Sequence, residues 1–327
     1  MNTRTLLLSS GLALTLASAC APHKDDTSSD LATRATAAIP AANDVKLAAP
    51  GDTGATTQRL SPRGLSTQDV PGASGPAEYY RFTRNLFDGV NLGTGWVLGT
   101  VLFIVHLPPT TVQGNVATWG PGSDSLEPAE WRLVVTETSH EAFTYELQGR
   151  RKGTSDAFES TLKGTGFGKS HADHGKGEFT LFFDVANKLD PTRLGAESDT
   201  GTTSVTHDLR GYPRIISASA HPSSSQHQWD IDTLRAADGT GTVHVDAQDD
   251  VSTPKNGTLE HVIFDSHFTA QGSGKAVATL SGGDVPNGLT VHVTECWSPA
   301  PAFTRSYYND DASLESTVGD AASCPSL

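Results

Sequence analysis

From residue 113 onward, apolar and polar residues alternate with a period of two, as in strands that bury one face. The stretches 131–136 and 143–148 show this alternation most clearly. Further segments of the same kind are Phe158–Leu162, Phe179–Val185, Thr203–Leu209, Ile215–Ala220, Trp229–Leu234, Thr242–Ala247, Leu259–Phe268, Ala276–Leu280 and Leu289–Cys296. Turn signals such as Ala237-Asp238-Gly239 and Pro286-Asn287-Gly288 separate them. The pattern predicts a mainly β fold, an antiparallel meander of about eleven or twelve strands.

A helix is expected before the strands, because apolar residues recur every three or four positions over Tyr79–Ile104. Gly75-Pro76 suits its start, and Pro108-Pro109 ends the pattern. An alternative interpretation breaks the helix near Gly93-Thr94-Gly95 and makes Val97–Leu107 a buried strand.

A sheet of this size has to curl, close or split into two layers. With one N-terminal helix packed on it, we expect a large curled antiparallel β-meander, a half-barrel that holds the helix in its concavity. A closed barrel and a two-layer sandwich are the alternatives.

The N-terminus has the pattern of a secretory signal peptide. Arg4 is followed by the apolar or small run Thr5–Ala19, which is shorter than the roughly 20 residues that span a bilayer. Leu16-Ala17-Ser18-Ala19-Cys20 resembles a bacterial lipobox, with Ala17 where Leu is usual. That resemblance implies cleavage before Cys20 and acylation of its thiol. The alternative is an ordinary signal peptide with Ala17-Ser18-Ala19 as its cleavage site.

Three regions follow from this interpretation. Residues 1–19 are the signal peptide, 20–75 are the lipidated cysteine and a flexible tether, and 76–327 are a single β-rich domain. The stretch 21–75 is rich in Ala, Thr, Ser, Asp and Pro and has no sustained apolar periodicity. Such a composition buries too little surface to offset the entropy of ordering, so we predict no structure there.

The chain has three cysteines. If Cys20 carries lipid, Cys296 and Cys324 remain, and an oxidising compartment favours joining them. Closing this loop would stabilise the fold by roughly 3 kcal/mol on the chain-entropy estimate. Neither residue belongs to a Cys-x-x-Cys motif, so we interpret the pair as a structural disulfide.

The formal net charge of −14 argues against nucleic acid as a partner. The predicted partner is instead the lipid bilayer, through acylated Cys20, with an apolar ligand or an envelope protein as a further candidate. Ala21, in place of Asp, follows the lipidated cysteine. By resemblance to enteric lipoproteins, this implies an outer-membrane anchor, with the domain facing the periplasm or the cell surface.

No motif in the chain predicts catalysis, a metal site or a cofactor. His171-Ala172-Asp173-His174 is the tightest metal-like cluster, but it lies in a Gly-rich stretch that we interpret as a hairpin tip. Lys163–Ser170 resembles a phosphate loop, but Lys163 stands where that motif requires Gly. The acidic runs 246–250 and 309–311 lack the spacing of a calcium loop.

The chain resembles uncharacterised bacterial lipoproteins of the myxobacterial kind in three motifs: Val105-His106-Leu107-Pro108-Pro109-Thr110, Trp119-Gly120-Pro121, and Glu295-Cys296-Trp297 with a later cysteine. This resemblance covers most of the domain and implies no activity. The expected architecture is also similar to that of the bacterial lipoprotein-carrier half-barrels, a likeness of fold that argues weakly for function.

Three functions are compatible with these patterns. The first is an envelope interaction or scaffold role, which an exposed aromatic patch over a filled core would favour. The second is a carrier or sensor of an apolar ligand held between helix and sheet, with Trp96, Phe103 and Trp131 available to line a cavity. The third is a hydrolase without a recognisable motif, which convergent titratable groups in a cleft would favour.

Overall fold

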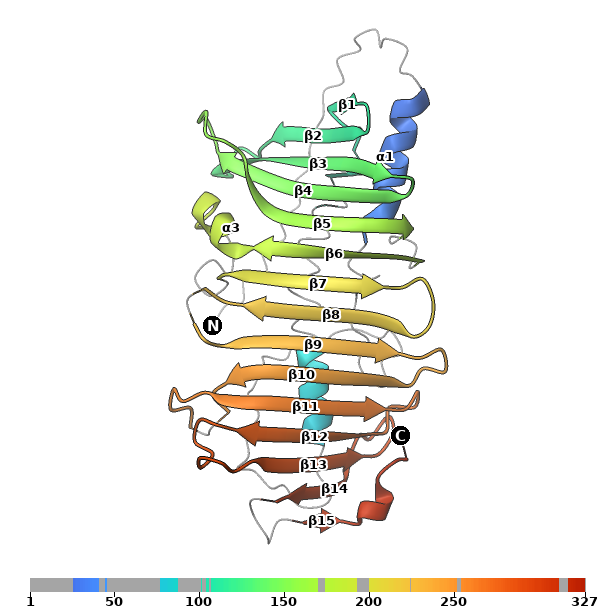
Figure 1. Cartoon of the computed structure of the whole chain (residues 1–327), viewed down its shortest axis with the longest axis vertical. Helices are drawn as coiled ribbons and strands as arrows, with labels where there is room; N and C mark the ends of the chain where they lie inside the picture. Colours follow the sequence, from blue (N-terminus) through green and yellow to red (C-terminus); the bar gives the residue numbers. More distant parts are fainter. Residues whose placement is uncertain are drawn as a thin grey trace, which may run out of the picture.

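One antiparallel sheet of fifteen strands, paired in strict chain order, dominates the structure (Figure 1). The computed structural model describes residues 26–40, 45, 77–87, 101, 104–105, 107–169, 174–192, 200–223, 225–251, 254–311 and 317–326, with residues 26–29 as backbone only. The sheet is curled and open, since β1 and β15 are its two edges. The predicted mainly β fold and large antiparallel meander are confirmed. The closed barrel and the two-layer sandwich are not formed.

The strands are β1 Thr111–Gln113, β2 Val116–Gly122, β3 Ala129–Ser139, β4 Ala142–Arg151, β5 Glu159–Lys169, β6 His174–Phe182, β7 Thr202–Asp208, β8 Arg214–His221, β9 Gln228–Arg235, β10 Gly241–Asp249, β11 Glu260–Phe268, β12 Gly274–Ser281, β13 Val291–Trp297, β14 Arg305–Asp310 and β15 Val318–Gly319. The predicted segments correspond to β3–β13. The sequence pattern missed β1, β2, β14 and β15.

The strand predicted over Phe179–Val185 was extended too far at its C-terminal end. Strand β6 stops at Phe182, and the chain continues as the short helix α3, Phe183–Leu189. The buried side chain of Leu189 fits against Gly149 of β4, where an added Cβ would lie 2.8 Å from a Leu189 methyl carbon. This packing of Leu189 against β4 therefore favours the short helix α3 over a longer strand.

Helix α1, Asp26–Ala38, lies on the inner face of the sheet beside β3–β5 (Figure 1). Its buried face is formed by Leu31, Ala35 and Ala38, and Ile39 follows directly. The backbone approaches β5 closely, because a Cβ at Gly166 would lie only 2.4 Å from the carbonyl oxygen of Ala38. The prediction of a flexible tether is therefore wrong for residues 26–40. Small alanines, which give no strong apolar signal, allow this close packing.

Residues 78–87 form a second helix on the same face. The rings of Tyr79 and Phe82 pack edge-on against Phe264 of β11, at centroid distances of 5.4 and 4.8 Å. The predicted helix is confirmed over these residues. Residues 101, 104 and 105 are also helical, which contradicts the alternative strand Val97–Leu107, whereas 88–100 lie outside the described residues.

The inner face of the sheet is buried from β4 to β13. One register row runs from β4 to β13, and apart from its glycine the inward side chains in it are at most 4% exposed. They are Tyr145, Phe179, Val205, Ala218, Ile231, Val245, Phe264, Ala278 and Val293. A hollow wide enough for a lipid chain would leave such side chains accessible to water, so the described part of this row borders none.

Candidate interaction surface

The described residues contain no group of three or more His, Cys, Asp or Glu side chains that could hold a metal ion. In the cluster His171-Ala172-Asp173-His174, only His174 is described, as the first residue of β6. The loop that resembles a phosphate-binding motif is ordinary strand up to Lys169, within β5. Trp96 and Phe103, suggested as lining residues of a cavity, lie outside the described residues, as does Cys20.

Glu295 of β13 is a fully buried carboxylate that holds the 78–87 helix to the sheet. One oxygen accepts from Arg305 Nε at 2.5 Å and from the backbone N–H of Glu78 at 3.1 Å. The other oxygen accepts from the backbone N–H of Tyr79 at 2.5 Å. These N–H groups belong to the first turn of the helix and have no partner within it. Glu295 therefore caps the helix from a distant strand, and Arg305 neutralises its charge. Both of its oxygens accept hydrogen bonds that hold the fold together.

Sequence reasoning missed this cap, although one signal was present. Val293, Glu295 and Trp297 alternate with Thr294 and Cys296, so the glutamate occupies an inward position on an apolar face. A carboxylate there needs a cationic or N–H partner.

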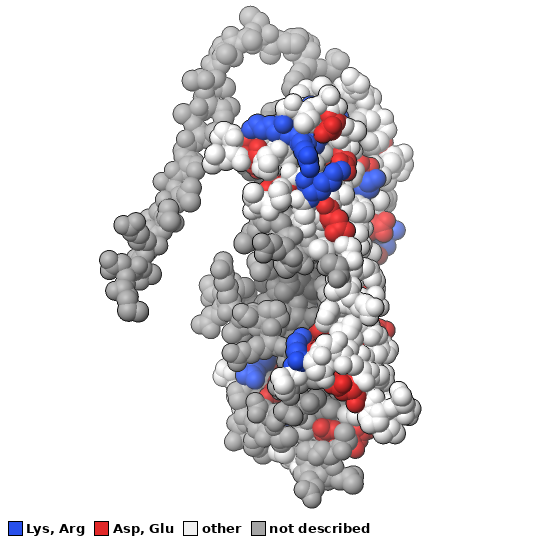
Figure 2. Space-filling model, turned by 90° about the vertical axis from the view of Figure 1, so that its left-hand side faces the viewer, with Lys and Arg blue, Asp and Glu red and all other residues white. Residues whose placement is uncertain are grey.

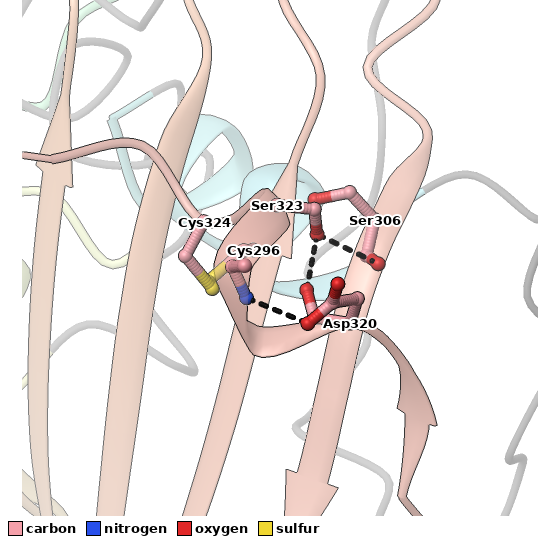
Figure 3. The surroundings of a disulfide bond; sticks show 6 residues. Cys296, Ser306, Asp320, Ser323 and Cys324 are labelled. Carbon is pink, nitrogen blue, oxygen red and sulfur yellow. Dashed lines mark hydrogen bonds between the residues drawn. A yellow bond between two sulfur atoms is a disulfide. The ribbon is translucent and has the colours of Figure 1, made fainter.

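The structure joins Cys296 and Cys324 in a disulfide with a Cα–Cα distance of 5.3 Å (Figure 3). Around it, Asp320 caps the 3-10 turn Ala321–Ser323 by accepting from the Ala322 N–H at 2.9 Å. The hydroxyl of Ser323 donates to the carbonyl oxygen of Ser306 on β14 at 3.1 Å. The disulfide thus attaches the C-terminal segment to β13, beside β14.

Two buried titratable groups, His207 and Tyr145, lie on the inner face of the sheet. His207 of β7 lies over Gly177, and burial lowers its pKa to about 4, against a smaller opposing effect of Asp208. The hydroxyl of Tyr145 is buried without a hydrogen-bond partner, and burial raises its pKa. The two side chains project from non-adjacent strands, so they do not converge on a described cleft.

The ends of β3–β5 and α3 carry a mixed group of charges, visible in the upper part of Figure 2. Arg132 and Arg150 both lie over the ring of Phe158, at 4.1 and 4.5 Å from its centroid. Arg150 also pairs with Glu130 at 2.8 Å, and Lys188 of α3 pairs with Glu159 at 2.7 Å. Because cations and carboxylates alternate and pair here, this region does not present the uniform positive charge that would bind a polyanion.

The outer face of the sheet, opposite α1 and the 78–87 helix, carries an exposed row that we call the outer patch: Phe167, Lys176, Asp208 and Ile215, direct neighbours on β5–β8. Phe167 and Ile215 are 38% and 44% exposed. The amine of Lys176 lies 5.8 Å from the centroid of the Phe167 ring. Arg210 lies beside the row and pairs with Asp208, whose pKa it helps to lower to about 2.

On β9–β11 the same outer face is acidic. Its outward positions hold Asp230, Asp232, Asp246 and Asp265 but neither Lys nor Arg. Two histidines contact these carboxylates, His244 with Asp265 at 2.7 Å and His261 with Asp246 at 2.8 Å. Both histidines thus lie on the outer face of the sheet, in contrast to His207 of β7, which is buried.

No family model, no curated protein and no solved structure matches this chain. The resemblance to myxobacterial lipoproteins and to carrier half-barrels therefore stays a prediction. No helix among the described residues is long and apolar enough to cross a membrane.

Proposed function

We propose that this chain is an exported lipoprotein of the bacterial envelope, anchored through acylated Cys20, that acts as a binding or scaffold protein through the outer face of its sheet. The observation that carries the binding role is the contrast between the two faces. The inner row is buried by the chain itself, whereas the outer patch leaves Phe167 and Ile215 exposed on a sheet face. Exposed apolar groups rimmed by charge are typical of protein interaction sites.

In this proposal the segment that joins the lipidated Cys20 to the folded domain is short. Helix α1 begins six residues after Cys20, a span of at most about 20 Å when fully extended. The helix runs from β3, where Arg34 pairs with Glu137 at 2.7 Å, to β5, where Ala38 meets Gly166. Its first turn therefore lies toward β1. Acylation of Cys20 would hold the β1 edge near the membrane, and the sheet would extend away from it by roughly 65 Å, at about 4.8 Å per strand.

The anchor is tested by expressing the full chain in a Gram-negative host, beside Cys20→Ala. We expect the natural chain to incorporate labelled palmitate and to partition into detergent with the membrane fraction. The Cys20→Ala chain should lose both properties. A natural chain recovered unlabelled and water-soluble after export would contradict the lipoprotein proposal.

The binding role is tested by thiol labelling of Ile215→Cys in isolated membranes. A partner on the outer face should slow labelling by maleimide at this position compared with dilute purified protein. The matched control is Asn287→Cys, in the exposed turn between β12 and β13, which should label equally fast in both. Equal labelling of Ile215→Cys in membranes and in dilute solution would contradict a role for the outer face.

A further inference from the structure

We propose that Asn287 is a site of spontaneous modification, at which the side-chain amide becomes a carboxylate through a cyclic imide, and that the fold protects Asn256 from the same reaction. Each of these residues is followed by glycine, and the sequence contains Asn-Gly at these two places. The chain therefore carries its own comparison between an exposed and a protected site. The inference is separate from the proposed function.

The reaction joins the asparagine side chain to the backbone of the next residue. The backbone nitrogen of the glycine loses its proton to base and attacks Cγ of the asparagine. A C–N bond forms, the Cγ–Nδ2 bond breaks, and Nδ2 leaves as ammonia with a proton taken from water. Water then opens the imide at either carbonyl, which yields aspartate or isoaspartate. Glycine favours the attack because it has no Cβ and its backbone is the least restricted.

Asn287 lies in an exposed turn between β12 and β13. The turn is closed by the N–H of Leu289, which donates to the carbonyl oxygen of Pro286 at 2.9 Å. Within the described part of the chain, neither the Asn287 carboxamide nor the N–H of Gly288 takes part in a hydrogen bond. Both reacting groups are therefore open to water and able to approach each other.

Asn256, in the loop between β10 and β11, is held at both reacting groups. The N–H of Gly257, which would supply the nucleophile, donates to Oδ2 of buried Asp250 at 2.6 Å. The Asn256 carboxamide donates through Nδ2 to Asp284 and accepts through Oδ1 from the N–H of Thr258, the latter at 2.8 Å. These bonds keep the glycine nitrogen and the asparagine Cγ from reacting.

Hydrogen bonding, and not backbone conformation, distinguishes the two sites. Gly257 and Gly288 have nearly the same φ, 84° and 81°. Attack by the Gly257 nitrogen requires loss of its bond to Asp250, whose negative charge also opposes removal of the proton. A hydrogen bond to a charged group changes an equilibrium constant by a factor of about ten or more. We therefore expect Asn287 to react at least about tenfold faster than Asn256 in the folded chain.

The test incubates the full mature chain with Cys20→Ser, its disulfide intact, in mildly alkaline buffer and follows the mass gain of amide-to-acid conversion. Trypsin cuts after Lys255, Lys275 and Arg305, so the peptides 256–275 and 276–305 report the two asparagines separately. The folded chain should show the tenfold difference, and the chain unfolded in guanidinium chloride should show similar rates. A ratio of rates that unfolding leaves unchanged would overturn the proposal, as would an Asn287 that stays unmodified in the folded chain.

Three variants examine the groups that protect Asn256. Asp284→Ala removes the acceptor of its carboxamide, and Asp250→Asn weakens the acceptor of the glycine N–H. Each should raise the rate at Asn256 at least about threefold and leave Asn287 unchanged. The matched control, Asp238→Ala in the exposed turn between β9 and β10, should change neither rate.

Asp284 is exposed, so its variant keeps the test valid even if the substitution of buried Asp250 unfolds the chain. Faster conversion of Asn256 in either variant, with an unchanged circular dichroism spectrum, supports the proposal. A rate at Asn256 that the folded variants leave unaltered would overturn it.

Discussion

Glu295→Gln is the substitution that tests the packing of the 78–87 helix on the sheet most closely. Glu295 is 0% exposed, and the side chain of its partner Arg305 is 2% exposed. The substitution removes the negative charge that pairs with Arg305, and it places an amide N–H₂ group where a carboxylate oxygen accepted from the N–H of Glu78 or of Tyr79. Removal of one partner from a buried ion pair costs about 3–5 kcal/mol. That is a large fraction of the roughly 5–15 kcal/mol that stabilises a typical domain.

The assay is urea unfolding of the purified mature chain, followed by circular dichroism and by tryptophan fluorescence. Fluorescence is informative because the ring of Tyr80, in the 78–87 helix, lies 6.2 Å from that of Trp297. The matched control is Glu159→Gln, which removes an exposed ion pair with Lys188 and should change the unfolding free energy by less than about 1 kcal/mol.

A double variant, Glu295→Gln with Arg305→Met, separates the buried charge from the helix cap. Because the positive charge that lost its carboxylate partner is removed as well, we expect it to be more stable than Glu295→Gln alone. The reasoning is refuted if Glu295→Gln is as stable as Glu159→Gln, or if the double variant is no more stable than the single one.

Three further predictions concern separate parts of the fold. Cys324→Ser should lower the unfolding free energy by roughly 3 kcal/mol by chemical denaturation, and an equal stability under non-reducing conditions would contradict a structural role for the bond. Burial lowers the pKa of His207 from its usual 6.5 to about 4, so the unfolded chain binds more protons in this window and stability falls as the pH drops from 6.5 to 4, by up to about 3 kcal/mol. His207→Leu should lose this part of the acid sensitivity and exposed His292→Leu should retain it; equal pH profiles for the two variants would count against the burial. Gly166→Ala should displace α1 and speed tryptic cleavage within it, whereas Gly122→Ala, where an added Cβ meets nothing within 4 Å, should not; an unchanged cleavage rate in Gly166→Ala would show that α1 is not packed as described.

The sheet was predictable because its signal is local and repeated. A buried strand such as β11, with Val262, Phe264 and Phe268 inward, shows the alternation in its own sequence. The terminal strands were missed for the same reason. Strands of two or three residues, such as β1 and β15, are too short to show a period, and only pairing with a neighbour defines them.

Helix α1 was not predictable from its composition. Its mean apolar content is low, and its contact with the sheet depends on Ala38 meeting Gly166, residues 128 positions apart. The cap by Glu295 likewise joins residues 216 and 217 positions apart in sequence. The outer patch depends on register, because Phe167, Lys176, Asp208 and Ile215 become neighbours only when four strands pair.

The central claim is that the chain fills the inner face of its own sheet and binds through the outer face. Native mass spectrometry of the full mature chain with Cys20→Ser, purified after export, tests it most directly. The account predicts a chain with no small-molecule adduct, two hydrogens light for the Cys296–Cys324 bond. An added mass that denaturation releases as lipid would contradict the account and favour a carrier with its ligand between helix and sheet.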